Sequence, residues 1–319
     1  MTAPEGRAVR VRPMVDGDLD AADRALRLAF GTVRGLPDPS AAFGDADLLR
    51  TRFRAAPECA WVAELDGEVV GSVLAARWGS FGFFGPLSVH PELWDRGIGS
   101  RLLEPVLEAF AHWGVRQAGL FTFAGSPKHL GLYQKHGFWP ASLTVVGAKA
   151  PEIHASDAFA LVSGELDGTD GPVLEEIRGL TDRVFPGLDV TREIVAAHAQ
   201  RLGDTLLLRH AGVLEGVAVC QYGPGTEAGR DRCFVKFAAC RPGHGAAETF
   251  EQLLDACDTF AASVGVARLV AGVNTGRLDA YRRMVARGFT AELVGVAMLL
   301  QPEAPHFDTP SDYVVDDLR

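Results

Sequence analysis

The sequence has few cysteines, and none are arranged to bind a metal or to form a redox pair. Its 319 residues include five cysteines, an odd number, without a C-x-x-C pair or a cysteine and histidine cluster at metal-ligand spacing. We therefore expect reduced thiols, no bound metal and a cytoplasmic protein. No apolar run approaches the roughly 18 residues that cross a bilayer, and none follows the charged N-terminal stretch, so we expect no membrane partner and no targeting segment.

Positive charge is also in short supply. The chain has 31 Lys and Arg residues against 41 Asp and Glu residues, a formal net charge of -10 at pH 7. Nonspecific binding to nucleic acid depends on Lys and Arg side chains that neutralise phosphates, so we expect no nucleic-acid partner. A cationic or neutral partner fits an acidic protein better, although net charge affects association and does not identify a substrate.

The length and the order of patterns along the chain indicate two related domains. The chain exceeds the usual size of one domain, and strand, helix and hairpin patterns recur in the same order in both halves. The recurring landmarks are Gly71 and Gly216 (145 residues apart), Gly97 and Gly243 (146), Tyr133 and Tyr281 (148), and Phe138 and Phe289 (151). This nearly constant offset predicts a duplicated domain, with boundaries at 1–152 and 153–319 and a linker within 148–157.

Each half is expected to contain one long amphipathic helix in its middle. The apolar residues that share a face at helical spacing are Leu102, Leu103, Val106, Leu107 and Phe110 in the first half, and Phe250, Leu253, Leu254, Cys257 and Val264 in the second. A short strand and a short helix follow each long helix, and a last strand closes each half. The same order in both halves supports the duplication.

Two glycines mark the passage from a predicted strand to the long helix in LSVHPELWDRGIGSRLL, residues 87–103. The first N–H groups of a helix have no partner within the helix, so a strand, a tight loop and a helix together form an anion site. Gly97 and Gly99 let the backbone approach a phosphate, and Arg96, Ser100 and Arg101 add donors, which favours a pyrophosphate ligand. The alternative is a plain turn that needs glycine for its geometry. A Walker A loop is excluded, and the third glycine of a dinucleotide fingerprint is missing.

This arrangement resembles the GNAT superfamily of acetyl-CoA-dependent N-acetyltransferases. The family carries Q/R-x-x-G-x-G/A after a strand, and the residues that match are Val89, Pro91, Gly97 and Gly99, with Trp94 where the family prefers Gln or Arg. A second family motif, N-x-x-A-x-x-x-Y-x-x-x-G-F, is matched by Tyr133, Gly137 and Phe138, with Ser126 at the Asn position. The resemblance covers residues 8 to about 150. It implies an α/β (α+β) fold of two tandem GNAT-like domains, each a mixed, mostly antiparallel sheet flanked by helices.

The resemblance also implies a reaction, a co-substrate and a set of binding residues. It implies transfer of an acetyl group from acetyl-CoA to a primary amine of a small molecule or peptide. The oligomeric state is left open between a monomer and a homodimer, and twofold dimers are the commonest oligomers of soluble enzymes. The cofactor site that the resemblance implies consists of Leu87, Ser88, Val89, Trp94, Asp95, Arg96, Gly97, Ile98, Gly99, Ser100, Arg101, Ser126 and Tyr133. Among these, Tyr133 is expected to protonate the leaving thiolate as general acid.

The general base is left open by the sequence. Many family members place a Glu on the motif strand, where this chain has Gly85. His90 is one candidate, and Glu92, a water relay or a substrate that loses its proton before binding are the others. His129 and His136 flank Tyr133 and are expected to be surface residues of its helix.

The second half matches the family less well. It keeps Gly243 and Gly245, and Tyr281 stands at the family spacing, but Gly288 and the Phe that follows lie three residues too far along. We expect a degenerate copy that binds CoA poorly and braces the first half. Two alternatives remain: an acetyl-CoA sensor or scaffold without turnover, or an enzyme whose activity lies in the second half.

Overall fold

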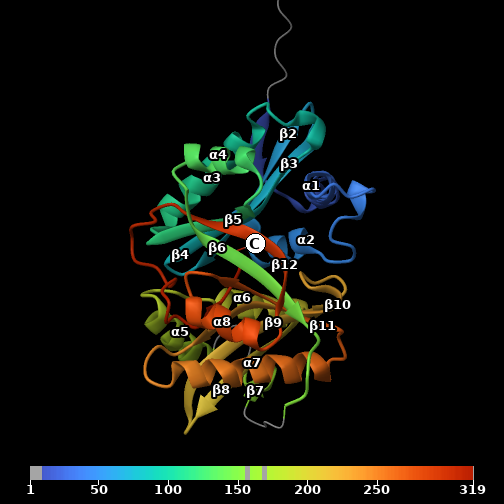
Figure 1. The fold of residues 1–319 in the computed structure, drawn as a ribbon. Coiled ribbons are helices and arrows are strands. Elements are labelled where there is room, and N and C mark those ends of the chain that lie inside the picture. The colour runs from blue at the N-terminus through green and yellow to red at the C-terminus, as the bar shows by residue number, and fades with distance from the viewer. Residues whose placement is uncertain (1–8, 155–158, 167–170, 319) are drawn as a thin grey trace, which may run out of the picture.

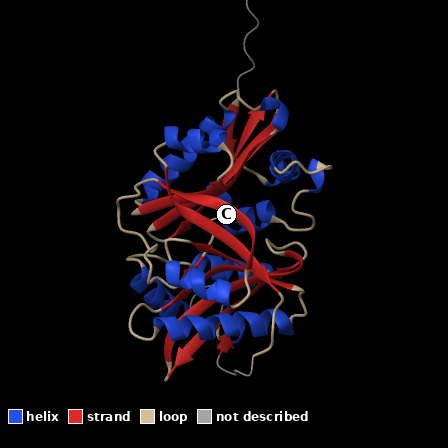
Figure 2. Cartoon of the chain, in the orientation of Figure 1, coloured by secondary structure: helices blue, strands red, loops and turns tan. Residues whose placement is uncertain are grey.

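The computed structural model describes residues 9–154, 159–166 and 171–318, and within them one continuous mixed sheet of 13 strands joins the two halves (Figure 1). Helices pack on both of its faces (Figure 2). Positions 155–157 of the predicted linker lie outside the described residues. The expected α/β fold with tandem GNAT-like halves and mostly antiparallel strands is confirmed.

The first half contains the elements that the sequence predicts. They are β1 (Arg10–Pro13), α1 (Leu19–Val33), α2 (Leu48–Ala55), β2 (Ala60–Leu65), β3 (Glu68–Trp78), β4 (Phe81–Val89), α3 (Ile98–Trp113), β5 (Gln117–Phe123), α4 (Pro127–Lys135) and β6 (Trp139–Lys149). Short 3-10 helices lie at Asp16–Asp18, Pro39–Ala41, Pro57–Cys59 and Pro91–Leu93. The β2 and β3 strands form the hairpin, with Asp66 and Gly67 at its turn in positive-φ conformations.

The second half repeats this order. It contains β7 (Phe159–Leu161), a 3-10 turn at Val162–Gly164, α5 (Pro172–Val184), α6 (Thr191–Gln200), β8 (Gly203–His210), β9 (Val213–Gly223), β10 (Gly229–Cys240), α7 (Ala246–Ser263), β11 (Arg268–Asn274), α8 (Leu278–Ala286) and β12 (Thr290–Leu299). One strand has no counterpart in the first half: β13 (Val314–Val315), which pairs with β10. The duplication of elements predicted from the landmark offsets is therefore present.

The last strands of the two halves are exchanged. In the sheet, β12 of the second half pairs with β5 of the first, while β6 of the first half pairs with β11 of the second, and β6 and β12 pair with each other. Figure 1 shows β6 running down into the lower half and β12 crossing beside β5. Where β12 lies beside β5, position 295 has room only for glycine, because a Cβ atom there would lie 2.3 Å from the ring of Phe121. The division at 152/153 stays a prediction, and the sheet continues across it.

Buried contacts attach the exchanged strand β6 to the second half and pack the long helices against the sheet. Lys149 at the end of β6 is buried and forms a 2.7 Å ion pair with the buried carboxylate of Asp258 on α7. The predicted face of α3 is confirmed, with Leu102, Leu103 and Phe110 nearly inaccessible to solvent. On α7, Phe250, Leu253, Leu254 and Cys257 of the predicted face are buried, whereas Val264 lies just after the helix and is partly buried. All five cysteines are buried free thiols.

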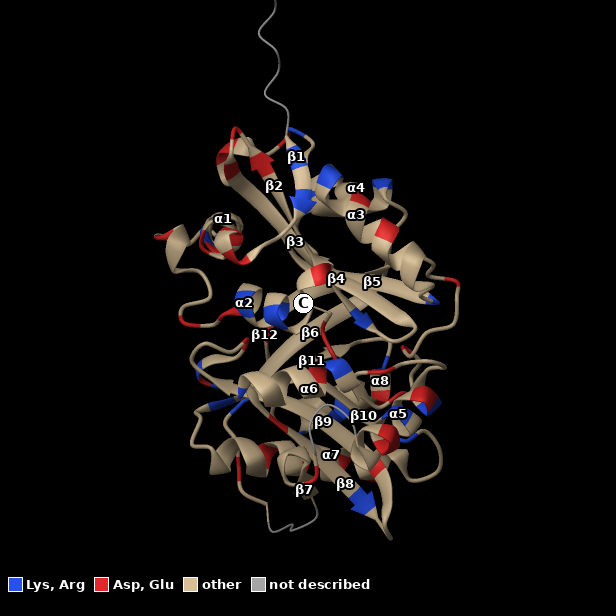
Figure 3. Cartoon of the chain, turned by 180° about the vertical axis from the view of Figure 1, so that it is seen from behind, with Lys and Arg blue, Asp and Glu red and all other residues tan. Residues whose placement is uncertain are grey.

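Charged side chains lie mainly on the helices and at strand ends. Figure 3 shows acidic and basic residues interspersed over the helices, whereas the strands of the central sheet are mostly uncharged. Among the described residues, the helices are either too short or too polar to cross a bilayer. The expected cytoplasmic location and absence of a metal remain predictions.

Candidate functional site

The sheet opens between β4 and β5, and a cavity of about 1270 Å³ begins at this opening. The two strands pair in parallel only where Phe81–Phe83 lies beside Gln117–Gly119. Beyond Phe83, β4 continues to pair with β3 as far as Val89, and its other edge borders the cavity. Strand-edge N–H and C=O groups that face a cavity are available to a bound ligand.

The glycine loop lies at one end of this cavity. Gly97 is the N-cap of α3 with φ of 75°, a left-handed conformation that favours glycine, and the first turn of α3 borders the cavity through Gly99 and Ser100. A Cβ atom on Gly99 would lie 3.3 Å from the side chain of Leu132 and 3.7 Å from that of Leu87. The loop therefore faces a narrow groove between β4 and α4, where the unpaired N–H groups of the helix can meet an anion.

The cavity brings together most of the residues predicted for the cofactor site. The predicted residues that line it are Leu87, Ser88, Val89, Trp94, Asp95, Gly97, Ile98, Gly99, Ser100, Ser126 and Tyr133. Arg96 and Arg101 lie beside the loop with exposed side chains. His90 and Glu92 follow the strand and are not among the described residues that line the cavity. The predicted roles of all these residues remain predictions.

Trp94 and Asp95 in the glycine loop both have partners within the first half. The indole of Trp94 donates to the carbonyl oxygen of Val89 at 2.7 Å, so it fixes the loop to the strand rather than offering a donor to a ligand. Lys128 on α4 forms a 2.7 Å ion pair with Asp95 and lies 5.2 Å from the Trp94 ring. The pair neutralises a carboxylate that would otherwise repel a phosphate in the groove.

Tyr133 lies in the cavity wall with its ring packed edge-on against Phe84, at a centroid distance of 5.7 Å. Its ring is buried, and burial raises the pKa of the phenol above its usual value, so the hydroxyl is protonated at neutral pH. Within the described part of the chain, no side chain or backbone group forms a hydrogen bond with this hydroxyl. A protonated hydroxyl at a cavity wall is suited to donate a proton to a bound ligand.

His129 lines the cavity, and the prediction that it is a surface residue is wrong. It is half-buried, lines the same cavity as Tyr133, and stands four residues earlier on the same face of α4. Its ring lies 6.5 Å from the Phe123 ring. Burial, assisted by the charge of Lys128, lowers the pKa of His129, which leaves the imidazole neutral at physiological pH. The available signal was its place in the second motif, where the family has Ala.

In the second half, the strand edge that corresponds to the open edge of β4 is covered by another strand. In the sheet, Val89 of β4 lies opposite Gly71, and Cys240 of β10 lies opposite Gly216, so Val89 and Cys240 are equivalent positions. Leu87 and Ser88, which precede Val89, are therefore equivalent to the two residues that precede Cys240. The two residues before Cys240, Ala238 and Ala239, pair with Val315 and Val314 of β13. The chain's own C-terminal segment thus occupies the edge of β10 that matches the cavity-lining edge of β4.

The second half also lacks a counterpart of Tyr133. Both α4 and α8 have nine residues, and the buried seventh residue is Tyr133 in one and Met284 in the other. Gly288 and the following Phe stand four and five residues after Met284, as the matching pair does after Tyr133. The predicted equivalence of Tyr281 with Tyr133 is therefore wrong. The pocket beside Met284 holds only about 30 Å³, room for one water molecule.

The register of the second glycine loop also differs from the sequence prediction. The N-cap of α7 is Gly245, with φ of 88°, and the N-cap of α3 is Gly97. Asp95 and Gly243 both have positive φ two residues before these caps. Gly97 therefore corresponds to Gly245, at an offset of 148 residues, and not to Gly243.

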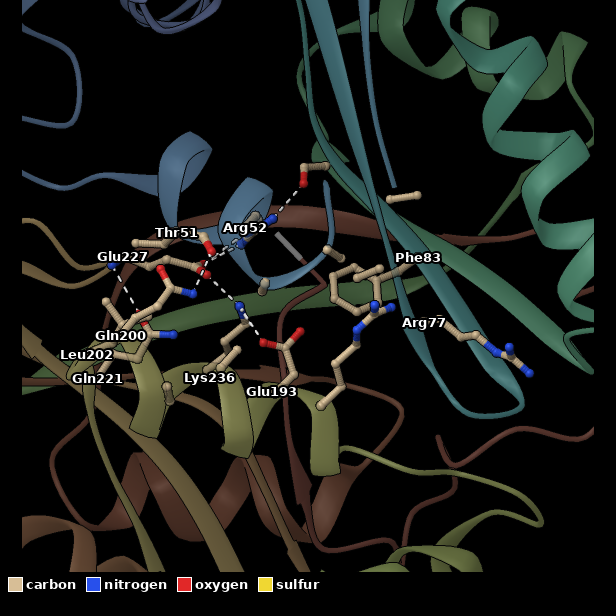
Figure 4. A pocket seen from close by; sticks show the side chains of 18 residues that line it. Thr51, Arg52, Arg77, Phe83, Glu193, Gln200, Leu202, Gln221, Glu227 and Lys236 are labelled. Atoms are coloured by element: carbon tan, nitrogen blue, oxygen red, sulfur yellow. Dashed lines mark hydrogen bonds and ion pairs between the residues drawn. The ribbon is translucent and has the colours of Figure 1, made fainter. Parts of the chain in front are cut away.

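A buried ion network joins the halves next to the site (Figure 4). Arg52 on α2 pairs with Glu227 of the second half at 2.5 Å and also donates to the carbonyl oxygen of Gly85 on β4 at 2.6 Å. Lys236 on β10 lies between Glu227, at 2.5 Å, and Glu193, at 2.9 Å. The network fixes the open part of β4 to the second half.

The charge state of Glu227 depends on its two cationic partners. Burial by itself would raise the pKa of this carboxyl, but the attraction of Arg52 and Lys236 outweighs burial and lowers the pKa to about 2. Glu227 is therefore a structural anion at neutral pH and a poor proton acceptor.

A family model and several solved structures resemble this chain. Residues 28–138 match the model of the acetyltransferase (GNAT) family. A putative acetyltransferase from Pyrococcus horikoshii superposes with a TM-score of 0.69 at 16% identity, over 100% of this chain and 97% of that one. A GCN5-related N-acetyltransferase from Sphaerobacter thermophilus has a TM-score of 0.55 at 19% identity, over 93% and 96% of the two chains.

A tandem GNAT protein from the clavulanic acid biosynthesis pathway has a TM-score of 0.54 at 14% identity, over 92% of this chain and 98% of that one. Its match extends across both halves of this chain, as do the two above. At such identities the structural likeness concerns the fold, and the two-domain architecture is shared along the full length.

We predict that Glu227→Gln lowers the free energy of unfolding by about 3–5 kcal/mol at pH 7, because Arg52 and Lys236 then lose a buried anion. The folded pKa of Glu227 lies below its usual value of 4.5, so its contribution is complete above about pH 4.5 and falls as the pH approaches 2. Denaturant unfolding at pH 7, 4 and 3 measures the difference between variant and wild type. The difference should shrink on acidification, and Glu68→Gln at an exposed position should show none. A difference independent of pH would contradict this account.

Proposed function

We propose that the first half, in which residues 28–138 match the GNAT acetyltransferase family, transfers the acetyl group of acetyl-CoA to a primary amine of a small molecule or peptide. The observation that carries the proposal is the contrast between the two strand edges. The cavity-facing edge of β4 is open, whereas β13 covers the matching edge of β10. On this proposal the second half has no transferase activity of its own.

The first half fits acetyl-CoA along the open edge of β4. Leu87 and Val89 would hold the pantetheine arm through their backbone groups, and the first turn of α3 would hold the pyrophosphate. Lys135 of α4 lines the same groove and adds positive charge beside the phosphates, while Lys128 offsets the charge of Asp95. Acetyl-CoA supplies the acetyl group as an activated thioester.

Two side chains of α4 carry the proton transfers on this proposal. Tyr133 donates its phenolic proton to the sulfur as the bond from carbon to sulfur breaks, which its raised pKa permits because the hydroxyl is protonated at neutral pH. His129 accepts the proton that the amine loses, since its lowered pKa keeps the imidazole neutral. A proton passes back from His129 to Tyr133 through solvent, so the pair is unchanged after each turnover.

We predict that Gly99→Leu weakens the binding of acetyl-CoA at least tenfold, because the added side chain fills the groove between Leu87 and Leu132. Isothermal titration calorimetry measures the affinity. The matched control is Gly179→Leu, since a Cβ atom at this exposed helical glycine meets open space. Equal affinity of wild type and Gly99→Leu would show that the glycine loop is a plain turn.

We predict that Tyr133→Phe lowers kcat at least about 100-fold while the acetyl-CoA affinity stays within about threefold, because only proton donation is lost. Thiol release in the presence of a panel of amines measures turnover. Tyr281→Phe should match wild type, because Met284 and not Tyr281 corresponds to Tyr133. Loss of turnover in Tyr281→Phe alone would move the activity to the second half. Acetyl-CoA binding without thiol release from any amine would favour the sensor.

We predict that kcat/KM of the wild type falls on acidification with an apparent pKa below 6.5, as His129 becomes protonated. The charged group that acts on this imidazole is Lys128, and Phe123 packs against it from β5. His129→Gln should lose this acidic limb together with most of the rate at neutral pH. His90→Gln should retain both. An acidic limb that disappears in His90→Gln instead would identify His90 as the base.

A further inference from the structure

The far wall of the large cavity is built by β6 of the first half together with elements of the second half. Five apolar residues line this wall. They are Val146 on β6, Ala228 in the turn before β10, Phe234 on β10, Val270 on β11 and Leu293 on β12. Four of them are buried and form a common apolar cluster, and Leu293 packs against it. The strand exchange places β12 next to β5 and β6 next to β12 in the sheet, and these residues line the same cavity as the open edge of β4. We call this set the apolar floor.

Aromatic side chains of the first half face the same space. Phe30 on α1 lies 5.3 Å from Phe43 and 6.1 Å from Phe123 on β5, and Phe121 lies 6.3 Å from Phe123, all measured between ring centroids. All four rings line the cavity. Together with the apolar floor they form a chamber of hydrocarbon surface beyond the glycine loop.

The carboxylates around this chamber are already neutralised. Three acidic side chains line the cavity: Asp95, Glu227 and Glu292. Asp95 pairs with Lys128, and Glu227 pairs with Arg52 and Lys236. Glu292 is held at 2.9 Å by Arg232 and at 2.7 Å by Arg268. Five cationic side chains line the same cavity, so its charge is opposite in sign to the net charge of the protein.

We infer that the chamber is the acceptor site and that it takes a monoamine with an apolar alkyl or arylalkyl body. This inference rests on the proposed function and adds the class of acceptor. The apolar body lies against the floor, and the amino group points toward Tyr133 and His129. A polyamine or an aminoglycoside fits poorly, because its further ammonium groups would meet hydrocarbon or paired carboxylates rather than a free anion.

The inference is tested with a series of straight-chain amines from propylamine to octylamine, with phenethylamine and spermidine as comparison substrates. Each methylene that enters the apolar chamber should raise kcat/KM about fourfold until the floor is reached. Spermidine should be a poor substrate despite its positive charge. A flat series, or a preference for spermidine over octylamine, overturns the inference.

Two variants of the apolar floor should change the longest alkyl chain that the chamber accepts, in opposite directions. Phe234→Ala enlarges the chamber and should move the best substrate to a longer chain, whereas Val270→Phe fills it and should move the best substrate to a shorter one. Val213→Phe, at an exposed position near the β8 and β9 turn, is the matched control and should leave the length profile unchanged. If Val270→Phe fails to fold, Phe234→Ala alone decides, because an unchanged profile in that folded variant overturns the inference.

Calorimetry separates the failure of this inference from the failure of the proposed function. Octylamine titrated into the protein saturated with CoA should bind, and Phe234→Ala should change that affinity at least fivefold without changing the affinity for acetyl-CoA. Acetyl-CoA binding with no turnover of any amine would refute the proposed function. Turnover of amines without dependence on chain length, and octylamine affinity that is the same in Phe234→Ala, would refute the apolar chamber alone.

Discussion

A strand edge inside a protein needs hydrogen-bond partners, and this requirement distinguishes the two halves of the chain. Beyond Phe83, β4 keeps its pairing with β3 but no longer pairs with β5, so its second edge borders the large cavity. Beyond Val235, β10 diverges from β11 in the same way, and Val314 and Val315 pair with the edge. One half thus keeps an edge for a ligand, while the other satisfies the same edge with its own chain.

The exchange of the last strands gives the closed half a different role. Since β6 pairs with β11 and β12 pairs with β5, the two halves share one sheet, and residues of the second half line the cavity at the opening in the first. Arg52 extends this connection, because one guanidinium binds both the carbonyl of Gly85 on β4 and the carboxylate of Glu227. The half whose matching edge is covered by β13 therefore contributes to the walls of the cavity in its neighbour.

Local patterns in the sequence predicted those parts of the structure that local interactions determine. The helix faces, the hairpin turn at Asp66 and the glycine N-cap of α3 each depend on residues close together in the chain. The exchanged strands and the tail strand at Val314 depend on pairings between distant residues, and period-two patterns do not select a partner. Counting residues also failed at Tyr281, because the seventh residue of α8, which matches Tyr133 in α4, is Met284.

The charge of the whole chain and the charge of the site have different consequences. The net negative charge of the chain creates an electric field outside the protein, and dissolved salt screens this field over about 10 Å. The field therefore influences the rate at which a cationic partner meets the protein. Recognition inside the cavity depends on groups that are still unpaired there. Glu227 and Glu292 each have two cationic partners, so neither presents a free anion to an amine. If the cavity is the acceptor site that we propose, an amine that enters it gains most from hydrocarbon contact, and selectivity follows from the apolar floor and the phenylalanine rings rather than from the net charge.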